Sequence, residues 1–128
     1  MVTGIFGVNT VAGERTHYGH VLDRENLLLY EEADGADYVE VSSLDEIVIA
    51  MSRSSPLRFD AQLGFHCYGT DICLQAREKG GRAYVVYVLA FHNSLGGYEL
   101  KPDFYRSADH LRAKWKHEEF IDTPCLRL

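Results

Sequence analysis

Apolar and polar residues alternate in several short stretches of the first half of the chain, a pattern typical of β-strands. Residues 3–11, TGIFGVNTV, predict a strand that two glycines weaken, and residues 12–20 predict a loop or hairpin after it. Residues 21–30, VLDRENLLLY, fit either a strand or a helical turn, because a run this short does not settle the period. The acidic segment at residues 31–37 predicts a turn.

The pattern is clearer from Asp37 onward. The segment DYVEV alternates, and the β-branched run at residues 46–54, EIVIAMSRS, predicts a second strand after it. Residues 82–91, RAYVVYVLAF, are almost entirely apolar and predict a long central strand that is covered on both faces.

Two segments have the period of amphipathic helices. Residues 70–80 predict a helix with a cap at residue 70 or 71 and an end at Gly80-Gly81. Residues 102–118 predict a second helix that begins at a proline and presents one apolar stripe. The expected fold is therefore α/β, with a mixed β-sheet of about four to six strands and two main helices packed on it.

Length and charge narrow the class of protein. A chain of 128 residues is expected to form a single domain with one core. The net charge of −6 argues against a broad nucleic-acid surface. The three cysteines lack a zinc spacing and fit reduced thiols, and no apolar run reaches the 18 residues that a membrane span needs. These features predict a cytoplasmic protein without a membrane span.

Asp71 is the first candidate for chemistry, because it lies where the first helix begins. A carboxylate there can act as a general base, or it can cap the helix, which is the commoner role. His66 and His92 flank the same segment, and a histidine at a strand end beside a glycine loop is a frequent ligand position. All three side chains are expected to line one cleft at the carboxyl end of the sheet. Together they could form the metal site of a hydrolase, although their spacing matches no metal signature.

Three arginines and one cysteine could have a functional role or a purely structural one. Arg53, Arg58 and Arg77 could hold a phosphate, or they could be solvated surface charges. Cys67 follows His66 directly, but adjacent residues of a strand point to opposite faces, so this pair does not suit a thiol nucleophile.

The order of four motifs resembles a known family. VSSLDEIVIAMSR, LRFD, FHCYGTDICLQAREKG and YVVYVLAFHNSLGG follow one another as in the second half of the inverting family-2 glycosyltransferases of the GT-A fold, most closely the StrF-like group. The resemblance covers roughly residues 37–118. It implies that the chain is a single glycosyltransferase-like domain, residues 1–128, equivalent to the acceptor-side half of such an enzyme.

The resemblance also implies roles for individual residues. Asp71 matches the base that deprotonates the acceptor hydroxyl, with Thr70 where the family usually has a glutamate. His92 matches a histidine that contacts the metal or the donor diphosphate. Asp45 falls near the acceptor loop, and Arg77 matches a basic position on the helix. With His66, these residues are the expected ligand-binding set, and a sugar or sugar nucleotide is the expected ligand.

The departure from the family is as informative as the match. The chain has no Asp-x-Asp motif and no nucleotide-binding half, so a divalent metal, Mn²⁺ or Mg²⁺, would bind only if a partner supplied that site. The expectation is a domain that is inactive alone or completes a transfer site with a partner chain. The alternative is a non-catalytic module that binds a sugar or small polar ligand. A half domain would leave a strand edge unpaired, which predicts a homo-oligomer.

Overall fold

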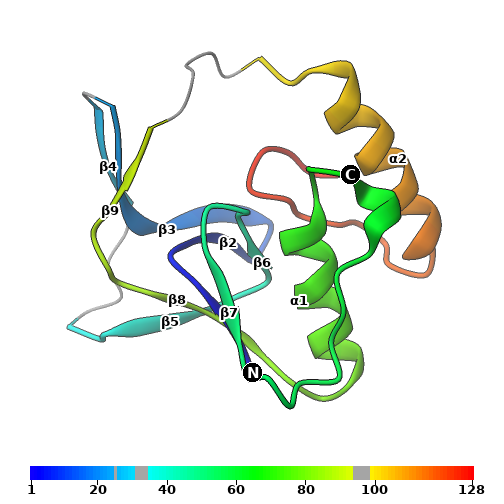
Figure 1. Cartoon of the computed structure of the whole chain (residues 1–128), viewed down its shortest axis with the longest axis horizontal. Coiled ribbons are helices and arrows are strands. Elements are labelled where there is room, and N and C mark those ends of the chain that lie inside the picture. Colours follow the sequence, from blue (N-terminus) through cyan, green and yellow to red (C-terminus); the bar gives the residue numbers. More distant parts are fainter. Residues whose placement is uncertain (25, 31–34, 94–98) are drawn as a thin grey trace.

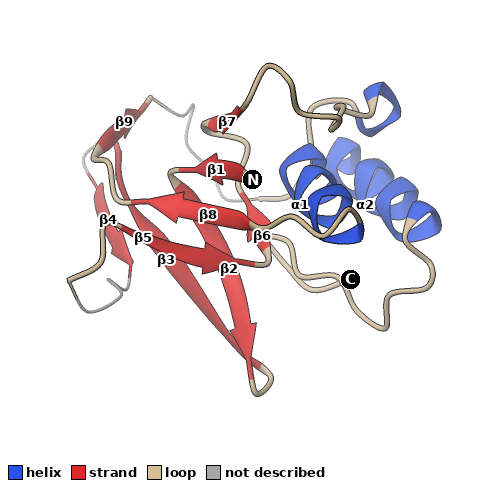
Figure 2. Cartoon of the chain, turned by 90° about the horizontal axis from the view of Figure 1, so that it is seen from below, coloured by secondary structure: helices blue, strands red, loops and turns tan. Residues whose placement is uncertain are grey.

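The computed structural model describes residues 1–24, 26–30, 35–93 and 99–128. Within these residues the chain forms two β-sheets and two α-helices, with both helices on one side of the strands (Figures 1 and 2). The expected α/β class with two helices packed on mixed sheet structure is confirmed. Residues 31–34 of the expected acidic turn, and residues 94–98 of the loop after His92, lie outside the described residues.

The first sheet has the strand order β5-β8-β1-β7. β1 pairs with β8 in parallel and with β7 in antiparallel orientation, and β5 pairs antiparallel with β8, so the sheet is mixed. The bounds of the four strands are β1 Val2–Gly4, β5 Tyr38–Val41, β7 Ile49–Met51 and β8 Ala83–Val86.

The second sheet is built around the longest strand, β3. β3 pairs antiparallel with β2 and β4 and parallel with β9, and β6 adds to the free side of β2. A two-residue turn with positive φ at both positions, Ala12 and Gly13, joins β2 to β3, as hairpin twist requires. The strands are β2 Phe6–Val11, β3 Glu14–Asp23, β4 Asn26–Tyr30, β6 Ser43–Leu44 and β9 Ala90–His92.

Two of the predicted strands are interrupted. The strand expected at residues 3–11 changes sheets at Ile5, between β1 and β2. The long strand expected at residues 82–91 also divides, because β8 pairs with β1 in the first sheet and β9 pairs with β3 in the second. An apolar run does not show which sheet each part joins, so the prediction of one continuous central strand was wrong.

The helices are η1 (Ala61–Leu63, a 3₁₀ turn), α1 (Tyr68–Glu78) and α2 (Pro102–Lys114). α1 ends as expected: Gly80 has a φ of 72°, and the N–H groups of Gly80 and Gly81 donate to the carbonyls of Arg77 and Ala76. Its beginning differs from the prediction. The N-cap is Cys67, in the left-handed region and without a side-chain cap bond, so Thr70 and Asp71 do not cap the helix.

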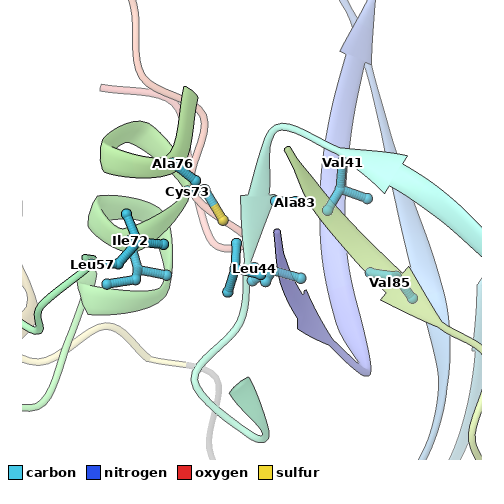
Figure 3. Packing of buried hydrophobic residues seen from close by; sticks show 9 residues of the cluster. Val41, Leu44, Leu57, Ile72, Cys73, Ala76, Ala83 and Val85 are labelled. Carbon is cyan, nitrogen blue, oxygen red and sulfur yellow. The ribbon is translucent and has the colours of Figure 1, made fainter. Parts of the chain in front are cut away.

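α1 contributes to two cores on its opposite faces. One face packs on the strands through Ile72, Cys73 and Ala76, which meet Leu44 of β6 (Figure 3). The other face meets α2 and the C-terminal segment through Cys67 and Leu74. The apolar stripe expected on the second helix is present in this core, as Phe104, Ala108, Leu111 and Trp115.

α1 approaches β6 so closely that position 69 in its first turn has no space for a side chain. A Cβ at Gly69 would overlap the carbonyl oxygen of Leu44. The hydroxyls of Thr70 and Ser43 lie 2.8 Å apart in the same interface and satisfy each other in a buried position. In the part of the chain that the structure describes, no helix has both the length and the apolar composition to cross a membrane.

Candidate functional site

Asp71 lies at the centre of a buried polar network between α1 and α2. Its side chain is completely buried. One carboxylate oxygen accepts a hydrogen bond from Trp115 Nε1 at 2.7 Å, and the other accepts one from Gln75 Nε2 at 2.7 Å. Lys114 Nζ lies 2.9 and 3.0 Å from the two oxygens. All of these partners stand on helices or directly after α2, so the network joins the two helices.

Lys114 bridges two carboxylates. Besides Asp71, its ammonium donates a hydrogen bond to Asp60 Oδ2 at 2.8 Å. Asp60 is the residue directly before η1. Hydrogen bonds from Lys114 and from the N–H of Gln62 lower the pKa of Asp60 to about 2. Asp60 therefore stays ionised at neutral pH, and the ammonium has a negative partner on both sides.

The enclosure of Asp71 determines what its carboxylate can do. Both oxygens are occupied by three donors, and none of the surface clefts described below includes the residue. A carboxylate held in this way is out of reach of a substrate hydroxyl. Its evident task is to fix α1 against α2.

The two candidate histidines lie apart from this network. His66 packs its ring against Phe65 and Phe104, at centroid distances of 6.1 and 5.7 Å. His92 ends β9 in the second sheet, with Nδ1 3.6 Å from Asp23 Oδ1. Among the described contacts nothing brings His66, Asp71 and His92 into one cleft. The cleft was expected because one strand was assumed to lead straight to His92, whereas the chain changes sheets before it.

Two other candidates have defined surroundings. Asp45 accepts a hydrogen bond from the N–H of Ile47 at 3.0 Å, and burial raises the pKa of its carboxyl, while His92 and His17 act in the opposite direction. Asp45 and His92 are thus within electrostatic range of each other. Arg77 pairs with Glu118 at 2.6 Å and borders two polar clefts that share Ser42. Ligand-binding roles for these residues stay predictions.

A more open cleft lies at the N-terminal end of α1. It has a volume of about 460 Å³ and contains two carboxyl side chains, two aromatic rings and apolar surface. The lining residues are Glu46, Ile49, Phe59, Asp60, Ala61, Gly64 and Tyr68. The sequence pattern predicted no element for the segment that carries Phe59 and Gly64, and this cleft was not expected.

Aromatic rings continue from the cleft over the ends of both helices. Phe59 meets Tyr68 edge-on at 5.5 Å, and Tyr68 meets Phe65 at 6.5 Å. Through His66 the ring contacts reach Phe104 and then Tyr105 on α2. We call this set the aromatic strip. Its members are Phe59, Phe65, His66, Tyr68, Phe104 and Tyr105.

Much of the aromatic strip faces solvent. Phe65 is 80% exposed, Phe59 is 53% exposed and Tyr105 is 52% exposed. Phe59 and Phe65 are joined through the half-buried ring of Tyr68, so they form a continuous exposed surface and not scattered apolar residues. Tyr105 is linked to them only through Phe104, which is buried.

Of the two carboxyl groups in this cleft, Glu46 has the higher pKa. Burial and the neighbouring Asp45 raise its pKa to about 7. The N–H of Gly69 donates to Glu46 Oε1 at 3.2 Å and opposes this shift without cancelling it. No lysine or arginine in the described part of the chain pairs with Glu46, which leaves the carboxyl half-ionised near neutral pH.

We expect Glu46 to make the protein less stable as the pH rises. Its pKa is about 7 in the folded chain against 4.5 for the unconstrained group, so the folded state holds more protons between these values. The free energy of unfolding then falls from pH 4.5 to pH 7. Glu46→Gln removes this contribution, and its stability gain over the wild type should grow with pH in urea unfolding from pH 5 to pH 8. A gain that is constant across that range would contradict the assignment.

Several of these residues could have been recognised earlier. Phe59, Phe65 and Tyr68 fall within ten positions of one another in a segment that breaks both strand and helix patterns. Three aromatic residues in such a segment indicate a surface rather than a core. Nothing in the local pattern identifies Lys114 or Trp115 as partners of Asp71, because that pairing joins positions more than 40 residues apart.

Comparisons with known proteins give one relative and no family. No family model matches the chain. A protein of Fuscovulum blasticum named "ATP synthase subunits region ORF 6" is 38% identical over 78 residues, which cover 59% of this chain. The same match covers 30% of that protein, so the chain corresponds to less than a third of its length.

These findings overturn the glycosyltransferase resemblance. The relative's name concerns ATP synthase subunits, not sugar transfer, so the inferred glycosyltransferase function and its carbohydrate ligand are wrong. The burial of Asp71 agrees, since the residue that the resemblance made a catalytic base has both oxygens bonded inside the fold. The sugar-binding alternative has no support. Within the described residues, no group of three histidine, cysteine, aspartate or glutamate side chains is placed to hold a metal ion.

Proposed function

We propose that this chain is a non-enzymatic accessory domain that docks on a protein assembly through the aromatic strip, and that the assembly is the ATP synthase. The observation that carries the proposal is the set of neighbouring rings around Phe65, of which Phe59, Phe65 and Tyr105 are exposed. Exposed aromatic side chains are enriched at the centres of protein interfaces, where they provide large contact areas at low entropic cost.

The architecture behind the strip supports a docking role. Asp71, Lys114 and Trp115 fix α1 to α2, and Tyr68, Phe104 and Tyr105 stand in the first turns of these two helices. Phe65 and His66 lie in the short segment between η1 and α1, where His66 packs against Phe104. A surface built on fixed helices loses little conformational freedom when a partner binds. The strip is therefore presented in a preorganised form.

The choice of partner rests on the relative. That protein's name places it in a region of ATP synthase subunits, which makes this complex the first assembly to test. A second copy of the chain is the competing occupant of the strip, in line with the homo-oligomer expected from the sequence. The cytoplasmic location expected from the sequence stays a prediction.

The test is a binding titration of purified ATP synthase, from the organism that encodes this chain, with the purified chain. We expect saturable binding, weakened at least tenfold by Phe65→Ser, because removing a central aromatic contact of an interface costs about 1.4 kcal/mol or more. Phe65 is 80% exposed, so the variant should fold normally, which circular dichroism would verify.

Two outcomes would reject the proposal. Absence of binding at concentrations well above the micromolar range would remove ATP synthase as the partner. Light scattering that shows the chain to be a dimer, with Phe65→Ser converting it to a monomer, would assign the strip to self-association instead.

A further inference from the structure

We propose that the cleft beside the aromatic strip receives a lysine or arginine side chain of the docked protein, with Glu46 as its counterion. This inference rests on the proposed function, because it names the chemistry by which the same surface would recognise its partner. It goes further in assigning a specific pocket and a specific charge.

The charges in the cleft favour a cation. Two of the seven lining side chains are carboxyls, those of Glu46 and Asp60, and no lining residue is basic. Asp60 already has Lys114 as its partner. Among the described contacts the Glu46 carboxyl accepts hydrogen bonds only from backbone N–H groups. A half-buried carboxylate without a positive partner has lost part of its hydration and gained no counterion in return.

The shape and the walls of the cleft suit a long side chain. A volume of about 460 Å³ is ample for the methylene chain and head group of lysine or arginine. The rings of Phe59 and Tyr68 stand edge to face in the wall, 5.5 Å apart. Aromatic faces attract ammonium and guanidinium groups, most strongly where the cation has lost part of its water.

The groups around Glu46 are almost all neutral or acidic. Asp45 is adjacent in sequence, and the thiols and phenol that face it have pKa values raised by burial, so they are uncharged at neutral pH. His17 and His92 act on Asp45. The titratable groups in this surrounding are Asp45, Asp60, Cys67, Tyr68, Cys73 and Cys125. None of these groups is positively charged. Lys114 and His110 face Asp60 from α2, where the ammonium of Lys114 is already paired with Asp60 and Asp71.

The experiment uses two small probes with the same four-carbon side chain, of which only one carries a terminal ammonium group. Nα-acetyl-lysine N-methylamide and Nα-acetyl-norleucine N-methylamide are titrated into the ¹⁵N-labelled chain, and the amide signals of Gly64, Tyr68 and Gly69 are followed by NMR. We expect the lysine probe to bind at least five times more tightly than the norleucine probe. Glu46→Gln should remove that preference and leave the norleucine affinity unchanged.

A matched control removes the same charge elsewhere. Glu78→Gln neutralises an exposed carboxylate in the last turn of α1, away from the cleft, and should change the lysine affinity less than twofold. In the wild type the preference for lysine should be stronger at pH 8 than at pH 6, because Glu46 is ionised at the higher pH. In Glu46→Gln this difference should be absent.

Equal affinity of the two probes, or a preference that survives Glu46→Gln, would overturn the inference. Either result leaves the docking proposal intact if Phe65→Ser still weakens binding to ATP synthase. Conversely, a lysine preference without any binding to ATP synthase would reject the proposed partner while the cleft assignment stands.

Discussion

Lys114→Met is expected to lower the free energy of unfolding by about 3 kcal/mol, since removing one partner of a buried ion pair leaves the other charge uncompensated. The charge left behind is Asp71, whose side chain is fully buried. The value belongs at the lower end of the usual range because 30% of the Lys114 side chain is exposed, which gives water some access. Urea unfolding monitored by the fluorescence of Trp115, which donates to the same carboxylate, provides the measurement.

Two further variants test the cause of this loss. Lys116→Met makes the same replacement at an exposed position two residues away and should change stability by less than 0.5 kcal/mol. Adding Asp71→Asn to Lys114→Met removes the buried charge and should recover part of the loss. If Lys114→Met and Lys116→Met are equally mild, the network does not hold the helices together.

Gly69→Ala is the second change with a large expected effect. The added methyl group would overlap the carbonyl oxygen of Leu44, so α1 would have to move away from β6. We expect a loss of about 3 kcal/mol, larger than the gain of about 1 kcal/mol that alanine brings to a helix. Thermal and urea unfolding would both show it.

Gly64→Ala separates lack of space from backbone strain. Gly64 has a φ of 62° and a ψ of −127°, a combination that glycine adopts and other residues rarely do, and nothing lies within 4 Å of its would-be Cβ. Its replacement therefore costs only backbone strain, about 1 to 3 kcal/mol. A loss of less than about 1 kcal/mol at Gly69, whatever the loss at Gly64, would show that the close contact between α1 and β6 does not limit the fold.

The helices were predictable from the sequence because their signals are local. The Gly80-Gly81 pair closes α1 through bonds within one turn, and Pro102 stands in the first turn of α2. Apolar residues at helical spacing indicated the stripe that packs in the second core. The start of α1 was missed because Cys67 adopts a left-handed conformation that nothing in its type suggests.

The sheets and the site depend on contacts that are distant in sequence. A run such as residues 82–91 predicts extended backbone but not that it divides between two sheets. The partners of Asp71 lie four positions away in one case and more than 40 in the others. From the sequence, Asp71 at the start of a helix could be an exposed general base. In the fold it is buried and joins α1 to α2 through its bonds with Lys114 and Trp115.

Motif order misled the functional interpretation for a related reason. Short segments that surround a helix start and a strand end recur wherever an α/β fold places a helix beside a sheet, and such likeness does not establish chemistry. The exposed rings of Phe59, Phe65 and Tyr105 are the more informative feature, because removing apolar surface from water is favourable and these rings would gain that free energy on a partner.

Docking through the aromatic strip is tested most directly by comparing two serine variants in the titration of purified ATP synthase. Leu89, 65% exposed, lies between β8 and β9 at the far side of the strands from the helices, so Leu89→Ser removes a similarly exposed apolar side chain away from the strip (Figures 1 and 2). If the chain docks through the aromatic strip, Phe65→Ser weakens binding at least tenfold and Leu89→Ser less than twofold. Equal effects, or loss of binding only in Leu89→Ser, would contradict it.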